Sequence, residues 1–291
     1  MKKALAFDIG GTKIYYAVIN ENGEIAGEIT KNSTPKTLEG ITDILKQGIS
    51  EHPEADVIAV ATAGAVNNEN TRVISSTGNL PDGYRNIDFQ SLSDKKVFVE
   101  NDANSASWAE HVIGSSKDCP NSIMLTLGTG VGGGIILNNQ LYKGKSGSAG
   151  EMHFKMYPDK RRKCTCGSYD CFEAYASGTG LKLTAEEMSG NLEITTYDVI
   201  DGVKLGCPEM TKIFKTWQNH IAQGIIGLAN IFDPDCFVLS GSMAEFVDVQ
   251  KIEEVVNSEI VTSPTSIRLG SAGNYSGMIG SALLAIESIK D

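Results

Sequence analysis

Two glycine-rich segments have the composition of phosphate-binding turns. The first is Asp8-Ile9-Gly10-Gly11-Thr12-Lys13, and the second is Gly128-Thr129-Gly130-Val131-Gly132-Gly133-Gly134. Glycine lets several backbone N–H groups converge on one anion, because no side chain blocks the approach and tight turns often need a positive φ. We therefore expect phosphate groups to bind between the two turns, with the hydroxyls of Thr12 and Thr129 as further donors.

Asp8 adds a carboxylate to the first turn. It stands near the end of the apolar run 4–9, with only Ile9 between it and the glycine pair. A carboxylate at the end of a buried strand, beside a phosphate loop, can hold Mg²⁺, usually through water. We expect magnesium here.

The second segment also contains the GxGxxG spacing, at Gly128, Gly130 and Gly133. That spacing indicates a dinucleotide fold only where it opens a helix inside a βαβ unit. Here Gly134 leads into the apolar run 135–137 and a turn, which predicts a strand and a hairpin. The chain has no GxxxxGK motif followed by Ser or Thr, so hairpin turns remain as the phosphate sites.

Asp102 is the candidate for proton transfer. It follows the short apolar strand 97–99 and stands where a helix to about residue 113 begins. Such a position holds a carboxylate rigidly at the end of a buried strand, as a general base requires. The same position also fits a simple helix N-cap, and both roles are compatible.

A cysteine cluster, Cys164, Cys166 and Cys171, places three thiols on one short segment. Zn²⁺ takes four N or S ligands in a tetrahedron, and three cysteines this close are difficult to explain as core residues. No secretory signal precedes them, so a disulfide framework is not expected. The cluster indicates metal or redox chemistry.

The order of predicted elements positions these residues in an α/β protein. Period-2 apolar runs predict strands and period-3.6 patterns predict helices. We expect strands at 4–9, 13–19, 24–30, 56–62, 97–99, 236–239 and 266–269, with a further strand pair around the second glycine segment. We expect helices at 38–50, 102–113, from 171, 208–232 and 277–289, loop-rich stretches at 63–90 and 143–170, and a linker at 114–121.

Composition excludes several classes of function. The chain has 291 residues, enough for two domains, and a formal net charge of −11, which disfavours broad binding to nucleic acid or anionic membranes. No segment approaches the length of apolar sequence that a membrane span needs, and the N-terminus lacks the pattern of a signal peptide. We expect a cytoplasmic protein with small-molecule substrates.

Five motifs in order along the chain resemble the ROK family of bacterial sugar kinases. They are DIGGTK at 8–13, NDA at 101–103, LGTGVGGG at 127–134, AGE at 149–151 and CTCGSYDCFEAYASG at 164–178. The resemblance covers nearly the whole chain. It implies a two-lobed α/β fold of the actin/hexokinase (ribonuclease-H-like) type with a central cleft, ATP and Mg²⁺ as cofactors, and a homodimer.

The resemblance also implies lobe boundaries and site residues. The first lobe is expected at 1–116, joined by the C-terminal helix 277–291, and the second at 117–276. Asp102 is implied as the catalytic base. The nucleotide is implied to contact Asp8, Gly10, Gly11, Thr12, Lys13, Gly128, Thr129, Gly130, Gly132, Gly133 and Gly241. The sugar is implied to contact Gly64, Asn79, Asn101, Asp102, Glu151, His153 and Glu173.

The fourth ligand of a structural Zn²⁺ is open. The family pattern GExGH places its histidine at Phe154, whereas this chain has Gly150-Glu151-Met152-His153-Phe154, with the histidine one residue early. A local shift of the backbone lets His153 serve as ligand and as a sugar contact. The alternative is an incomplete site without metal.

The function expected from the resemblance is ATP-dependent phosphorylation of the 6-hydroxyl of a hexose or N-acylhexosamine. N-acetylmannosamine is the favoured sugar. Glucokinase and fructokinase activities are the alternatives, because the sugar pocket depends on the loops 63–90 and 140–180. A nucleotide-binding regulator on the same fold is the hypothesis from another class, and sugar-dependent release of ADP distinguishes it from a kinase.

Overall fold

The computed structural model describes residues 1–76 and 78–290. Thr77, inside the predicted loop 63–90, and Asp291, the end of the predicted helix 277–291, lie outside the described residues. The chain forms two compact units. The first contains Met1–Pro120, Gly134–Gly150 and Ser271–Asp291, and the second contains Asn121–Gly133 and Glu151–Gly270. The lobe boundaries expected from the family resemblance stay a prediction.

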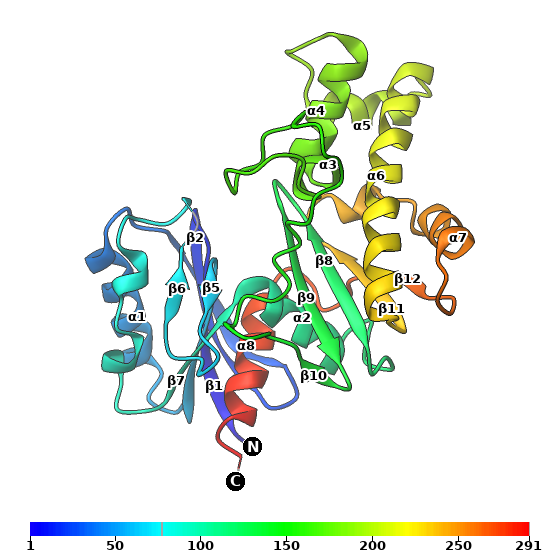
Figure 1. The fold of residues 1–291 in the computed structure, drawn as a ribbon. Helices are drawn as coiled ribbons and strands as arrows, with labels where there is room; N and C mark the ends of the chain where they lie inside the picture. The colour runs from blue at the N-terminus through cyan, green and yellow to red at the C-terminus, as the bar shows by residue number, and fades with distance from the viewer. Residues whose placement is uncertain (77, 291) are drawn as a thin grey trace. The chain divides into compact units, whose positions relative to one another are not determined.

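The first unit is built around a five-stranded sheet of order β3-β2-β1-β4-β7 (Figure 1). Its strands are β1 (Lys3–Ile9), β2 (Lys13–Asn20), β3 (Ile25–Ser33), β4 (Val57–Thr62) and β7 (Val97–Asn101). Its helices are α1 (Leu38–Glu51), α2 (Asp102–Val112) and α8 (Ser276–Glu287). The small hairpin β5 (Ala65–Val66) and β6 (Val73–Ser75), and the 3₁₀ turns η1 (Tyr84–Asn86) and η2 (Phe89–Leu92), lie in the predicted loop 63–90.

β1 shows how the sequence specifies two covered faces. Large side chains at Leu5, Phe7 and Ile9 pack in one core cluster, whereas the small Ala4 and Ala6 belong to another. Because successive residues of a strand point to opposite faces, the alternation separates these two cores. Asp8 therefore points to the same face of the sheet as the alanines.

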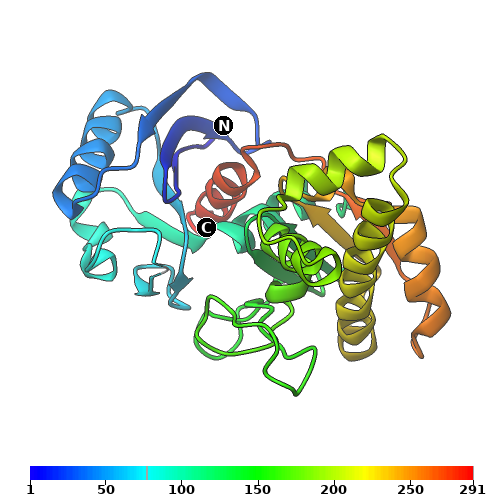
Figure 2. The same ribbon diagram turned by 90° about the horizontal axis from the view of Figure 1, so that it is seen from above.

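Helices cover both faces of this sheet. α1 contributes Ile41 and Leu45 to the first cluster, and α8 contributes Met278 and Ala282 to the second. Figure 2 shows α1 and α8 on opposite sides of the sheet, and α8 also packs on α2. A strand buried on both faces has no polar alternation, which is why residues 4–7 are entirely apolar.

The second sheet has the order β10-β9-β8-β11-β12. Its strands are β8 (Ser122–Leu127), β9 (Val131–Leu137), β10 (Gln140–Leu141), β11 (Cys236–Ser240) and β12 (Ser266–Leu269). The helices of the second unit are α3 (Glu173–Ala176), α4 (Gly178–Ser189), α5 (Thr196–Lys204), α6 (Pro208–Phe232) and α7 (Val249–Glu259), with the 3₁₀ turn η3 (Ala244–Phe246).

The predicted α/β class is confirmed, and most predicted elements agree with the observed ones to within a few residues. The helix expected from Cys171 begins at Glu173 and is interrupted at Ser177, whose side chain caps α4 by accepting from the Gly180 N–H. The helix α8 ends at Glu287. Within the described residues, no helix combines the length and apolar character that crossing a bilayer requires.

Candidate functional site

The first glycine loop joins β1 to β2 and holds itself in shape through its own backbone. The Gly10 N–H donates to the Lys13 carbonyl at 3.0 Å, and the Thr12 carbonyl accepts from the Thr34 N–H at 3.0 Å. In the part of the chain that the structure describes, the N–H groups of Gly11 and Thr12 have no acceptor. Two consecutive free N–H groups on a braced turn form a suitable anion site.

Asp8, beside this loop, lies near the end of β1 and is partly buried. Burial, together with the nearby charge of Asp102, raises the pKa of Asp8 to about 7. The first turn of α8 lies close, since a Cβ at Gly277 would come within 3.3 Å of Asp8 Oδ2. A cation bound beside this carboxyl would lower its pKa and so favour its charged form at neutral pH.

Asp102 is not the helix N-cap that its position allowed. The cap of α2 is Asn101, whose Oδ1 accepts from the N–H groups of Ala103 and Asn104 at 2.9 and 3.0 Å. Asn101 ends β7 in extended conformation, so the helix begins at Asp102, one residue earlier than an Asp102 cap would place it. Because Asn101 satisfies the helix end, the Asp102 carboxylate, which accepts from the Ala103 N–H at 2.9 Å, remains available for other chemistry.

The environment of Asp102 favours its neutral form. Solvent reaches the side chain, but most of its surroundings are protein atoms, and this desolvation raises the pKa of Asp102 above the ordinary carboxyl value. The hydrogen bond from Ala103 acts in the opposite direction. A raised pKa suits a group that accepts and releases a proton near neutral pH.

A buried ion pair that sequence reasoning missed lies directly behind this end of β7. Glu100, fully buried, pairs with Lys143 at 2.9 Å and accepts from the Asn70 amide at 2.7 Å. Glu100 also accepts from the Asn101 N–H at 2.8 Å and the Asn104 amide at 3.2 Å. These bonds fix the residues on both sides of Asp102, and they join the strand to a segment 43 residues away, which no local pattern reveals.

Two predicted sugar contacts, Gly64 and Asn79, lie in the same unit as Asp102. Gly64 has φ of 100°, and a Cβ there would lie 2.2 Å from the Ser75 carbonyl oxygen, so glycine is required. Its own carbonyl accepts from the Asn101 amide at 3.0 Å. Asn79 packs against Gly11 of the first glycine loop, where a Cβ would approach the Asn79 Cβ to 2.8 Å.

The second glycine loop also uses part of its backbone internally. The Gly128 N–H donates to the Gly130 carbonyl at 3.0 Å, and the Gly132 N–H donates to Thr126 Oγ1 at 3.1 Å. Over the residues the structure covers, the N–H groups of Thr129 and Gly130 find no acceptor. Gly133, also predicted here, lies buried in β9. This loop therefore presents the same pair of consecutive free donors as the first one.

The loop is held from outside by α3 and α4. Glu173 Oε2 accepts from the Val131 N–H at 3.1 Å, and the Gly178 N–H donates to the Gly128 carbonyl at 2.8 Å. Thr179 Oγ1 donates to the Thr129 carbonyl at 2.8 Å. Gly241, an implied nucleotide contact, packs on the end of β8, because a Cβ there would lie 2.5 Å from the Leu127 carbonyl oxygen.

Gly130→Ala and Gly128→Ala form a matched pair of predictions in this loop. A Cβ at Gly130 would lie 2.4 Å from Glu173 Oε2, whereas a Cβ at Gly128 meets nothing within 4 Å. We expect Gly130→Ala to cost about 1–3 kcal/mol of unfolding free energy, because the clash displaces the carboxylate from the Val131 N–H. Gly128→Ala is expected to be neutral or slightly stabilising. Urea unfolding of the two variants tests this, and equal stabilities would contradict the packing described.

The three clustered cysteines lie together with His153. Their ligand atoms and one ring nitrogen of His153 all lie within 4.8 Å of one another. The Cys166 and Cys171 Sγ atoms are 3.5 Å apart, and Cys164 Sγ is 3.7 Å from His153 Nδ1. A tetrahedral Zn²⁺ with Zn–S of about 2.3 Å and Zn–N of about 2.0 Å separates its ligands by about 3.5–3.8 Å. The donor set therefore fits a zinc ion in both chemistry and spacing.

A backbone turn brings His153 into this cluster in place of residue 154. Met152 has φ of 45°, in the left-handed region, and Gly150 has φ of 93°. Phe154 is stacked on Phe172 with ring centroids 5.0 Å apart, and its carbonyl accepts from the Phe172 N–H. The expected local shift is thus present in the structure, and His153 Nε2 lies 3.8 Å from Glu151 Oε2 on the side away from Cys164.

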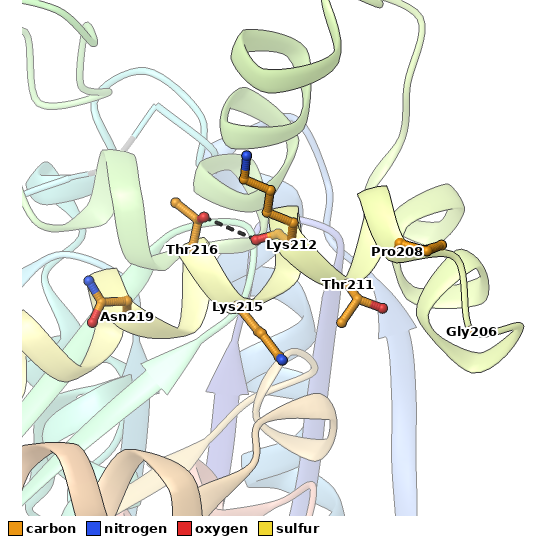
Figure 3. Close-up of a pocket in the computed structure, with 7 residues that line it drawn as sticks. All are labelled: Gly206, Pro208, Thr211, Lys212, Lys215, Thr216 and Asn219. Atoms are coloured by element: carbon orange, nitrogen blue, oxygen red, sulfur yellow. Dashed lines mark hydrogen bonds between the residues drawn. The ribbon is translucent and has the colours of Figure 1, made fainter.

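A separate hollow lies on the second unit but contains none of the predicted site residues. Figure 3 shows it along the start of α6, lined by Gly206, Pro208, Thr211, Lys212, Lys215, Thr216 and Asn219. These residues lie on the face of α6 opposite its buried residues Ile213, Trp217 and Ile221. The hollow is open solvent-facing surface, so we assign it no role in the site.

Comparison with known proteins relates the whole chain to one family. The ROK family profile matches residues 4–288. The chain is 32% identical over 322 residues to a glucokinase from Streptomyces coelicolor, covering 99% of this chain and 98% of that protein. It is 32% identical over 298 residues to an N-acetylmannosamine kinase from Yersinia pestis, covering 99% and 100%.

Among solved structures, a ROK family glucokinase from Streptomyces griseus, in complex with glucose and AMPPNP, resembles this one with a TM-score of 0.80. It shares 28% sequence identity, and the match covers 98% of this chain and 99% of that chain. The predicted actin/hexokinase-like class is confirmed by this likeness.

Proposed function

Because the chain belongs to the ROK family and is an ATP-dependent sugar kinase, we propose that it phosphorylates the 6-hydroxyl of a hexose or an N-acylhexosamine. The observation that carries the reaction class is the family match over residues 4–288. The site geometry supports the roles of individual residues. A carboxylate freed from helix capping, beside a second carboxylate and a turn with free N–H groups, is what phosphoryl transfer requires.

In this proposal Asp102 is the general base. It takes the proton of the sugar 6-hydroxyl as that oxygen forms a bond to the γ-phosphorus, while the bond from phosphorus to the β-γ bridging oxygen breaks and ADP leaves. The Glu100 network behind it holds the end of β7 in place. The free N–H pairs of the two glycine loops are proposed to bind phosphate oxygens.

Asp8 is the residue proposed to hold magnesium. Among the described residues, no cationic side chain pairs with its partly buried carboxylate. The raised pKa of Asp8 reflects this uncompensated negative charge, which a bound cation would stabilise. Mg²⁺ supplies charge neutralisation on the phosphate oxygens when it is bound. Lys13, exposed at the start of β2, is proposed to contact the same phosphates.

N-acetylmannosamine is proposed as the preferred sugar, with glucose as its closest rival. Relatives with both activities are equally identical to this chain, at 32%. The alignment with the N-acetylmannosamine kinase spans 298 positions against 322 for the glucokinase, so it needs fewer gaps against this 291-residue chain. Glu151 and His153 are proposed to contact the sugar.

The test is a coupled ADP-release assay over N-acetylmannosamine, N-acetylglucosamine, glucose, mannose and fructose. We expect sugar-dependent ADP release with the highest kcat/KM for N-acetylmannosamine. A higher kcat/KM for glucose would replace the sugar assignment and keep the reaction. ADP release that no sugar stimulates would favour a nucleotide-binding regulator.

We also propose that the cysteine cluster and His153 hold one structural Zn²⁺. The four ligand atoms lie within 4.8 Å of one another. His153 Nε2 faces the Glu151 carboxylate, which would orient the imidazole ring as in many zinc sites. Burial raises the pKa of Cys164 to about 12, so zinc must displace protons and its affinity must rise with pH.

Metal analysis of purified protein tests the zinc site. We expect one zinc per chain in the wild type and less than about a fifth of that in Cys166→Ser after dialysis against a weak chelator, since the affinity depends on all four ligands. Cys207→Ser is the matched control, because Cys207 lies at the start of α6 and outside the cluster. Full zinc content in Cys166→Ser would contradict the proposed ligand set.

A further inference from the structure

We propose that Glu173 is a positioning residue that couples occupancy of the cysteine cluster to nucleotide affinity. The inference rests on the proposed function, since it uses the nucleotide loop and the metal site, and it adds a route between them. One carboxylate, at the first residue of α3, bonds to both loops at once. This role is separate from any contact of Glu173 with the sugar.

The two oxygens of Glu173 contact different loops. Oε2 accepts from the Val131 N–H at 3.1 Å, in the second glycine loop. Oε1 accepts from the Thr165 hydroxyl and lies 3.5 Å from Cys164 Sγ, both in the cysteine segment. Thr165 lies between two of the three cysteines in sequence, so its position depends on how those cysteines are held.

The glycine-loop side of the bridge is closely fitted. A Cβ at Gly130 would lie 2.4 Å from Glu173 Oε2, so the carboxylate occupies the space beside the loop. By holding the Val131 N–H, Glu173 directs the chain that presents the free N–H groups of Thr129 and Gly130. A donor pair fixed before the ligand arrives binds an anion better than one that must be ordered on binding.

The cysteine side of the bridge changes when a metal binds. Cys164 Sγ lies 3.5 Å from Glu173 Oε1, and the adjacent Thr165 donates to the same oxygen, so an ion that holds Cys164 also restrains the donor of Glu173. Zinc also fixes the segment 164–171 at three points, its cysteines. The Thr165 hydroxyl is then held in one place, and Glu173 and the glycine loop are held with it.

The expected effect is a coupling between two ligands. Zinc raises the affinity for Mg-ADP about three- to tenfold by ordering this bridge, and linkage requires Mg-ADP to raise the affinity for zinc by the same factor. Neither quantity depends on sugar binding or on turnover.

Calorimetric titration with Mg-ADP, without sugar, tests the coupling on zinc-loaded and chelator-treated protein. In the wild type we expect zinc removal to weaken Mg-ADP binding three- to tenfold. In Thr165→Val the loaded protein is expected to bind Mg-ADP as weakly as the zinc-free wild type, with no further loss on zinc removal. Glu173→Gln, which keeps one oxygen and gains an N–H₂ donor, is expected to retain part of the coupling.

Thr179→Val is the matched control. Its hydroxyl also bonds to the glycine loop, at the Thr129 carbonyl, but it has no contact with the cysteine segment. We expect any change in Mg-ADP affinity in this variant to be equal with and without zinc. The zinc affinity of the wild type, measured by competition with a chromophoric chelator, is expected to rise by the same factor when Mg-ADP is added.

Several outcomes overturn the inference and leave the kinase proposal standing. These are equal Mg-ADP affinity with and without zinc, normal coupling in Thr165→Val, or a folded protein that takes up Mg-ADP but no zinc. If circular dichroism shows that chelation unfolds the protein, the zinc-loaded variants alone decide. A wild-type affinity for Mg-ADP in zinc-loaded Thr165→Val would then overturn the inference. Failure of folded protein to bind Mg-ADP at all would instead overturn the proposed function.

Discussion

Asp102→Asn is expected to lower kcat by about 10²–10⁴-fold, the range that general-base catalysis contributes. The asparagine oxygen still accepts from the Ala103 N–H, and Asn101 still caps α2, so the fold has no reason to change. Only the capacity to take a proton is lost. Steady-state kinetics measure the loss, and calorimetry with sugar and with Mg-ADP is expected to give wild-type affinities.

The same assignment has a consequence for pH. Asp102 must be ionised to accept a proton, and its pKa is raised, so kcat/KM is expected to fall on the acid side at a pH above the ordinary carboxyl range. At Mg²⁺ concentrations that keep Asp8 ionised, the remaining activity of Asp102→Asn is expected to lack this limb. A kcat within a few-fold of the wild type, or an unchanged acid limb in the variant, would remove Asp102 from the role of base.

Much of the fold could be predicted because its signals are local. The apolar run 4–9, the helical spacing in 208–232 and the turn residues between them each depend on neighbours in sequence, and the corresponding elements form as expected. The cysteine spacing predicted a metal site for the same reason. The offset of His153 became interpretable only with the structure. Met152 adopts a left-handed φ, and methionine is not a residue type that sequence reasoning expects in that conformation.

The missed features depend on tertiary contacts. Asn101 rather than Asp102 caps α2, because the helix begins one residue before the point that an Asp102 cap would give. Lys143 pairs with Glu100 from a segment distant in sequence, and Thr165 reaches Glu173 from the cysteine segment. One signal was available in the sequence. Glu100 directly follows the strand predicted to be buried, and a buried carboxylate needs a partner such as the lysine that Lys143 supplies.

Asp8→Asn is expected to impair activity and to stabilise the ligand-free protein, and the two effects have one cause. The folded protein raises the pKa of Asp8 from 3.8 to about 7. Over that interval the folded state binds a proton that the unfolded state has released, so stability falls as pH rises from about 4 to 7. Asparagine cannot ionise and avoids this loss, but it also cannot offer a charged ligand to Mg²⁺.

The stabilisation has a defined size and pH window. A pKa difference of this extent corresponds to at most about 4 kcal/mol, and solvent at the partly exposed side chain reduces it. We expect the stability of Asp8→Asn relative to the wild type to be about 1–3 kcal/mol greater at pH 8 than at pH 5, measured by urea unfolding without magnesium or nucleotide. We expect kcat to fall about 10–100-fold at saturating Mg²⁺.

Asp43→Asn is the control for both effects. Asp43 is exposed on α1 of the same unit, so its replacement makes the same change in charge without removing a partly buried carboxyl. We expect its activity to be that of the wild type and its stability to differ from the wild type by the same small amount at both pH values. If Asp8→Asn behaved like Asp43→Asn, the desolvated carboxyl would have no functional use, and magnesium would have to be held elsewhere. If Asp8→Asn lost activity without gaining stability at pH 8, the Asp8 charge would already be compensated by a partner in the free protein, contrary to the environment that the structure gives it.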